Sequence, residues 1–275
     1  GQHCEGLIVE NKSGRQFSPA GLFVGRTGDA DILFRGGVPT VQGHNYFTYS
    51  AYGIDLAHCK EAAESGRIER AIFNMPGGTA NLFGKNQPEG KPLYTGTSGE
   101  DVNQYLFDNQ LTLLNRLKKD DRRTRQVISL PGMCQYRTTR RIDGDYTLKV
   151  SDVYRHFADS ITAVNDFEHR NFLYEIPYRT LVRKGYDNLI TAGRSASGEG
   201  YAWDIVRVIP PAILTGQAVG CAAAQALSDG VGIDGIDVPK LQNTLARQNV
   251  LLHFDDSWIP KEGEPEVKEG PSNHI

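Results

Sequence analysis

A short apolar run that stops on a glycine is the feature of this sequence with the clearest chemical meaning. Residues 188–192, NLITA, end at Gly193 and Arg194, a loop rich in serine and glycine follows, and a long helix-like stretch comes next. Proteins of the α/β class build phosphate and cofactor sites where a strand ends on glycine and faces the start of a helix. The pattern therefore predicts a phosphate or cofactor site at this turn.

A cluster of arginines is the second feature that could do chemistry. Arg137, Arg140 and Arg141 stand close together in the sequence. Guanidinium groups pair bidentately with carboxylates, so these side chains could hold an anionic substrate. An ion-paired strand that bridges two domains would use the same residues, and the sequence leaves both interpretations open.

The histidines and cysteines give no sign of a metal site. The seven histidines show no metal-ligand spacing, and we expect His44, His58, His156 and His169 to be surface or core residues. The four cysteines are widely separated and include no CxxC pair. They predict reduced thiols in a cytoplasmic protein, and neither a disulfide framework nor a bound metal.

The composition is that of an ordinary soluble globular protein. The 275 residues allow one large domain or two smaller ones, and 23% of them are charged and 39% hydrophobic. A formal net charge of −3 argues against a nucleic-acid partner, which would need a concentrated basic face. No stretch approaches the roughly 18 apolar residues that span a membrane, and the polar start GQHCEG lacks the shape of a signal peptide. We therefore expect a cytoplasmic location and no membrane span.

The elements that position these residues begin with strands. Residues 6–10 form an extended run, residues 11–14 form a turn, and further extended runs start at Arg15 and cover residues 21–24. This pattern predicts two or three strands of a β-meander. A first strand without an obvious partner is unusual, so we expect the chain to be part of a longer protein.

Cap residues and apolar periodicity predict the helices. The expected helices are Asp55–Glu64, one opened by Ser98, one opened by Ser151 that carries Val153, Phe157 and Ile161, the long Ile205–Leu227, and one opened by Asp237. Residues 75–97 are expected to be a loop. The tail, residues 256–275, is expected to be disordered.

Three segments of the sequence resemble one protein family. Residues 174–220 contain IPYR, a lysine-glycine turn, DNL-x-x-AGR, R-V-x-P and GQA-x-G. This spelling resembles the C-terminal flavin-binding segment of the FAD-dependent oxidoreductase family, in the glutathione-reductase-like flavoprotein group. Residues 27–31 (TGDAD) and residues 137–148 (RTTRRIDGDYTL) are similar to two further segments of that family.

The resemblance implies a fold and a domain organisation. The expected fold class is α/β, α+β overall, a partial glutathione-reductase-like FAD domain with an inserted mixed α/β substrate domain. Residues 1–48 and 172–255 would form the FAD-domain parts, and residues 49–171 the inserted substrate domain.

The resemblance also implies a cofactor, FAD, and its contacts. Gly193 and Arg194 would lie beside the ribityl-pyrophosphate arm of FAD. The turn of residues 205–208, expected to open the long helix, would offer free N–H groups and a positive dipole end to the negative charge near flavin N1 and C2=O. The full set of implied cofactor-binding residues is Thr27, Gly28, Asp29, Gly193, Arg194, Ser195, Ile205, Val206 and Arg207.

The implied reaction is hydride transfer between a small substrate, which the sequence does not identify, and the flavin. The candidate catalytic residues are Arg207, which adds formal charge at the helix start, Arg140 and Tyr178. Tyr178 could face the flavin or pack beneath it.

Some features depart from the family pattern. The only G-x-G-x-x-G, residues 230–235, follows a helix and is expected to connect two helices. We therefore expect a C-terminal portion whose Rossmann half is supplied in cis or in trans; a cofactor-free fragment, or a non-catalytic subunit that needs a partner, is the alternative. The chain also has Gly25-Arg26-Thr27-Gly28 where the family reads DATG, and Gly200 where a histidine is common.

Overall fold

The computed structural model describes residues 2–81, 83–169 and 171–261. These residues form two compact units: the first unit combines residues 2–42 with residues 140–261, and the second unit comprises Gly43–Thr139. Residues 140–171, expected in the inserted domain, thus belong to the first unit. The architecture mixes helices with several small sheets, as the predicted α+β class requires.

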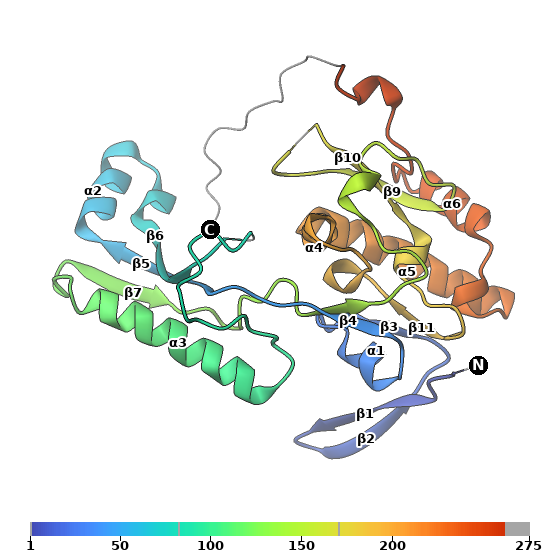
Figure 1. The fold of residues 1–275 in the computed structure, drawn as a ribbon, viewed down its shortest axis with the longest axis horizontal. Coiled ribbons are helices and arrows are strands. Elements are labelled where there is room, and N and C mark those ends of the chain that lie inside the picture. The colour runs from blue at the N-terminus through green and yellow to red at the C-terminus, as the bar shows by residue number, and fades with distance from the viewer. Residues whose placement is uncertain (1, 82, 170, 262–275) are drawn as a thin grey trace. The chain divides into compact units, whose positions relative to one another are not determined.

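The chain opens with the predicted hairpin and then departs from the predicted meander. Strands β1 (Gly6–Asn11) and β2 (Gly14–Pro19) pair in antiparallel fashion. Strand β3 (Phe23–Gly25) does not continue this sheet. It pairs in parallel with β11 (Leu189–Thr191), the strand predicted before Gly193 (Figure 1).

Two further strand pairs complete the sheets of the first unit. Strand β4 (Thr40–Gln42) pairs with β8 (Arg140–Ile142), and β9 (Ser160–Asn165) pairs with β10 (Leu173–Pro177), both antiparallel. A short helix, α1 (Asp31–Arg35), follows β3. Each sheet of this unit therefore has only two strands among the described residues.

The prediction of a helix after Ser151 is wrong. Residues Val150–Asp152 form a single 3-10 turn, η2, after which Tyr154 adopts a left-handed φ of 62° that interrupts any helix. Ile161, predicted on the helix, lies in β9 instead. Its β-branched side chain suits a buried strand position.

The predicted long helix is two helices. Helix α4 (Tyr201–Arg207) ends before Val208, which is extended with φ −71° and ψ 163°, and α5 (Ile209–Asp229) continues at 69° to it. Pro210 and Pro211 have no N–H to donate to the Val206 and Arg207 carbonyls four residues earlier, and their rings would clash with those carbonyls, so one continuous helix cannot form. No single described helix is long and apolar enough to cross a membrane, although α4 and α5 reach that length and composition as a bent pair.

The end of the first unit agrees with the predicted caps. Gly230 ends α5 in the left-handed conformation, and the Asp237 carboxylate accepts the Lys240 N–H at the start of α6 (Val238–Arg247). The glycine-rich segment between them contains only the 3-10 turn η5 (Ile233–Gly235), so it connects two helices as predicted. The core of this unit includes Ile161, Tyr174, Ile176, Ile190, Val206 and Leu241.

The described residues of the second unit form a three-stranded antiparallel sheet and two α-helices. The strand order is β6 (Ile72–Thr79), β5 (Thr48–Asp55), β7 (Arg125–Ser129), and α3 (Gly99–Leu117) contacts β6. Part of the predicted loop 75–97 is therefore strand β6. Its pairing with β5 spans a Pro-Gly-Gly sequence that reads locally as a turn.

The predicted caps of the helices in this unit are confirmed. Asp55 caps α2 (Leu56–Ser65) through the His58 N–H, and Gly66 ends that helix in the left-handed conformation. Ser98 accepts the Asp101 N–H at the start of α3.

The predicted disordered tail is described only in part. Its first residues form a 3-10 turn, η6 (Asp256–Trp258), which that prediction did not anticipate. Residues 262–275 lie outside the described residues.

Candidate functional site

The candidate site is built from the two loops that follow the parallel strands β3 and β11. Because the strands are parallel, both loops leave the same edge of the sheet, where α/β proteins bind ligands. Gly28 has a φ of 88° and Gly193 a φ of 70°, conformations that favour glycine. The structure thus brings together the two segments that the sequence singled out.

Arg194 joins the two loops. It lies in the 3-10 turn η4 (Gly193–Ser195), its Nε donates to the Gly28 carbonyl at 2.8 Å, and its Nη2 donates to Asp29 Oδ1 at 2.8 Å. A Cβ on Gly28 would lie 2.7 Å from the Arg194 Nη2, so a larger residue there would displace the guanidinium. Three of the predicted cofactor residues therefore form one hydrogen-bonded unit.

The hydroxyl groups of Thr27 and Ser195 take part in the local structure. Thr27 Oγ1 accepts the Asp31 N–H at 3.1 Å on the exposed loop after β3. Ser195 is fully buried, and its Oγ lies 2.6 Å from Thr191 Oγ1 and 3.2 Å from the Ala192 carbonyl. The Ser195 hydroxyl therefore holds η4 against the end of β11.

Helix α5 packs against η4 through small side chains. The Gly193 N–H donates to Thr215 Oγ1 at 3.0 Å, and Thr215 Oγ1 in turn donates to the Pro211 carbonyl at 2.7 Å. A Cβ on Gly193 would come within 3.4 Å of the Ala212 Cβ. The start of α5 is thus fixed next to the loop after β11.

The predicted helix start at residues 205–208 is corrected: residues 205–207 end α4, and Val208 directly precedes α5. Ile205 and Val206 are buried in the last turn of α4, and Arg207 forms an ion pair with Asp204. The helix start near the site is that of α5, where the missing N–H groups of Pro210 and Pro211 remove two of the usual donors. The charge predicted for Arg207 is therefore already paired.

Arg26 is a site residue that the prediction missed. Its exposed guanidinium makes one long hydrogen bond, 3.4 Å to the Ala212 carbonyl. It lies over Gly193 and Gly216: their Cβ atoms would be 3.5 Å from Nη2 and 2.3 Å from Nη1. Among the described residues no carboxylate lies within ion-pair distance of it. The sequence contained a sign of this residue, because residues 25–28 read GRTG where the family reads DATG.

Tyr178 is buried away from solvent. It is 3% exposed, and its hydroxyl donates to the Ile233 carbonyl at 2.6 Å. Burial raises the pKa of this phenol well above its usual value, so it stays protonated. The sequence left open whether Tyr178 faces the flavin or packs beneath it, and its burial agrees with packing.

The arginine cluster is divided between the units. Arg140 Nη1 lies 3.2 Å from Asp31 Oδ1, and its guanidinium stacks 4.1 Å from the Phe34 ring centroid. Arg141 is buried, donates to Ser197 Oγ at 2.9 Å, and has its pKa lowered by burial. These contacts match the ion-paired alternative for Arg140. Arg137 belongs to the second unit.

A hollow in the second unit contains none of the predicted site residues. Its volume is about 540 Å³. Acidic, basic and apolar side chains of α2, α3, β5, β6 and β7 line it, among them Asp55, Phe73, Met75, Leu113, Arg116 and Arg125.

Comparison with known proteins identifies the family. A sequence model of the family described as FAD dependent oxidoreductase matches residues 74–245. That range contains β11, η4, α4 and α5, and the loop after β3 lies outside it. No curated protein and no solved structure matches the chain. Because the match covers more than half of the sequence, this chain belongs to the FAD dependent oxidoreductase family.

Proposed function

We propose that this chain supplies the flavin-facing half of a flavoenzyme of the glutathione-reductase-like group, which passes hydride between a small substrate and FAD. The observation that carries the proposal is the junction at the carboxyl edge of β3 and β11, where Arg194 ties the loop of Gly28 and Asp29 to η4. Dinucleotides bind in the crevice outside the carboxyl ends of parallel strands. Membership of the family supports FAD as the cofactor.

The residues around this junction fit an anionic cofactor arm. Arg26 offers an exposed guanidinium without an ion-pair partner among the described residues, directly over Gly193 and Gly216. The start of α5 adds the positive end of its dipole, although its two prolines leave few N–H donors. We therefore assign to Arg26 the charge that the sequence suggested for Arg207.

When bound, FAD supplies the hydride chemistry, and the protein's task is to bind and orient it. We propose that Thr27, Gly28, Asp29, Gly193 and Arg194 shape the loops that receive the cofactor. Ser195, Ile205 and Val206 are buried, so we assign them to supporting these loops from the core.

The candidate catalytic residues act indirectly in this proposal. The Arg140, Arg207 and Tyr178 side chains each have a partner within the protein: Asp31, Asp204 and the Ile233 carbonyl. We therefore propose that they position the elements around the substrate and flavin.

The nucleotide-facing half is proposed to come from another segment, in cis or in trans. Parallel sheets normally have both faces covered and several strands, whereas β3 and β11 form a pair of three-residue strands in which Val24 is 38% exposed. The sequence contains no strand–GxGxxG–helix unit. A Rossmann half would supply further strands at the edges of this pair and helices to cover the exposed strand face.

The test is the state of the protein purified together with that half. The coding sequence next to this chain, or the candidate partner chain, is expressed with it, and the flavin spectrum and the cofactor released on denaturation are recorded. We expect a yellow protein that releases FAD in a one-to-one ratio. A protein that is folded by circular dichroism, yet colourless and unable to bind added FAD, would contradict the proposal and favour a non-catalytic subunit.

A further inference from the structure

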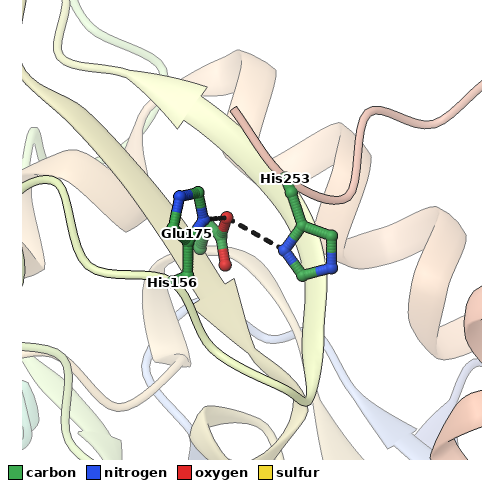
Figure 2. A group of neighbouring side chains, drawn as sticks. All are labelled: His156, Glu175 and His253. Atoms are coloured by element: carbon green, nitrogen blue, oxygen red, sulfur yellow. Dashed lines mark hydrogen bonds and ion pairs between the residues drawn. The ribbon is translucent and has the colours of Figure 1, made fainter. Parts of the chain in front are cut away.

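Three residues far apart in the sequence meet on the first unit, at a distance from one another that suits a metal ion. Figure 2 shows His156, Glu175 and His253 with their polar atoms turned toward one another. His156 Nδ1 lies 2.5 Å and His253 Nδ1 lies 3.0 Å from the same carboxylate oxygen, Glu175 Oε1. The three ligand atoms all lie within 4.8 Å of one another.

The Glu175 carboxylate is buried, and the cost of burying it must be offset by polar or charged partners. It is fully buried on β10, and its second oxygen, Oε2, accepts the Phe157 N–H at 2.7 Å. A buried carboxylate is costly unless it is paired, hydrogen-bonded or bound to a metal. The backbone N–H holds one oxygen, so Oε1 is the atom presented to the two imidazoles.

The second ring nitrogen of His156 faces a carboxylate, as it commonly does in metal-bound histidines. Its Nε2 lies 2.8 Å from Asp256 Oδ1, while its Nδ1 faces Glu175. A metal-ligating histidine usually donates its other ring N–H to a carboxylate, which fixes its tautomer and orientation. The ring also stacks on Phe254, with centroids 4.3 Å apart. His156 is therefore oriented from two sides.

The backbone carries His253 to this place. The segment after α6 runs beside β9, where the Ala163 N–H donates to the Leu251 carbonyl at 2.6 Å. Ser160 Oγ donates to the Leu252 carbonyl, also at 2.6 Å. These bonds fix the position of His253 relative to the β9–β10 pair, so the cluster is built by the fold.

We propose that His156, Glu175 and His253 bind a divalent transition-metal ion of the zinc class. Two imidazole nitrogens and one carboxylate oxygen are ligands that zinc accepts, whereas magnesium and calcium prefer oxygen alone. Tetrahedral zinc at its usual bond lengths separates two ligand atoms by about 3.3 Å. The two N···O distances of 2.5 and 3.0 Å would have to lengthen by about 0.8 and 0.3 Å to reach that spacing, which rotation of the half-exposed imidazoles can supply.

The fourth coordination position is open to water. The side chains of His156 and His253 are 42% and 47% exposed, so the ion would reach the cluster from solvent. A bound ion would fasten the segment after α6 to β10. The sequence predicts no metal site because the ligands are 19 and 78 positions apart.

Metal titration of the tag-free chain, first stripped with a chelator, tests the proposal. Zn²⁺ is added in competition with a chromophoric chelator, and Co²⁺ is used as a spectroscopic probe. We expect one Zn²⁺ per chain, a rise in the Tm on addition of Zn²⁺, and the intense visible bands of four-coordinate Co²⁺. Asp256→Asn should weaken the affinity by about 10- to 100-fold, since second-shell partners have effects of that size.

Matched variants separate this site from adventitious binding. His253→Gln replaces a half-exposed side chain and should abolish the tight site while the circular dichroism spectrum is unchanged. His58→Gln is the control, because His58 bonds to a single carboxylate, that of Asp55. Stoichiometric binding that is lost in His253→Gln and kept in His58→Gln supports the site. Absence of one-to-one binding, or equal affinity in both variants, overturns it and leaves the three residues as a hydrogen-bonded group.

Discussion

Arg194 connects the two loops of the candidate site, so its replacement should lower the stability of the protein. Arg194→Gln takes away the bonds to the Gly28 carbonyl and to Asp29, in a pair whose side chains are 30% and 22% exposed. We expect the free energy of unfolding to fall by about 1–2 kcal/mol, the usual size for lost hydrogen bonds to a charged group. Urea unfolding measures it. An unchanged midpoint would show that the strands alone hold the loops.

Arg26, in contrast, should affect FAD binding and have little effect on stability. Its side chain is exposed and makes one long hydrogen bond, so Arg26→Gln should change the free energy of unfolding by no more than about 0.5 kcal/mol. In the protein with its Rossmann half, the same change should weaken FAD binding at least several-fold. Arg35→Gln, on the exposed end of α1, is the control. Equal FAD affinity in the two variants would mean that Arg26 merely covers the glycines.

At the scale of elements, helix caps are the features that local sequence determines. Asp55→Ala and Asp237→Ala, one in each unit, should each lower the free energy of unfolding by about 1 kcal/mol, because each carboxylate accepts an N–H in the first helical turn. Thermal and urea unfolding of the two variants checks this. A cost near zero at both positions would refute the assigned cap geometry.

The cost at Asp55 should also depend on pH. The His58 backbone N–H, followed by its side chain, holds the pKa of the Asp55 carboxyl below its usual 3.8. A lowered folded pKa contributes stability that is present above the unfolded pKa and is lost as the pH falls through the folded one. The difference between the parent protein and Asp55→Ala should therefore be full at neutral pH and shrink below pH 3.8. A difference that stays constant into acid would exclude the charged cap.

The elements that the sequence failed to predict depend on distant contacts. The caps at Asp55, Ser98 and Asp237 were predictable because their partners lie in the next turn. Strand β9 was mistaken for a helix because its pairing with β10 has no local signal. The parallel pairing of β3 with β11 joins segments that lie far apart in the chain.

The candidate site, too, was predictable only where the signal is local in the sequence. Motif resemblance located Gly28, Asp29 and Arg194, which the structure brings together. The helix-like pattern predicted a helix start at residues 205–208, whereas α5 begins at Ile209, directly before Pro210 and Pro211. The cluster of His156, Glu175 and His253 could be found only in three dimensions.

At the scale of the whole molecule, the central claim is that this chain carries one half of a FAD site. The two-stranded parallel pair, the glycine loops at its edge and the family match support this claim. In this proposal the other half holds the adenosine part of FAD, because this sequence contains no strand–GxGxxG–helix unit. Most of the affinity should therefore depend on the Rossmann half.

Titration of FAD, followed by flavin fluorescence, tests this claim most directly. It is carried out with the chain alone and with the chain joined to, or mixed with, its Rossmann half. We predict no saturable binding in the micromolar range for the chain alone and tight one-to-one binding for the combination. Micromolar or better affinity of the chain alone, or none in the folded combination, would contradict the account.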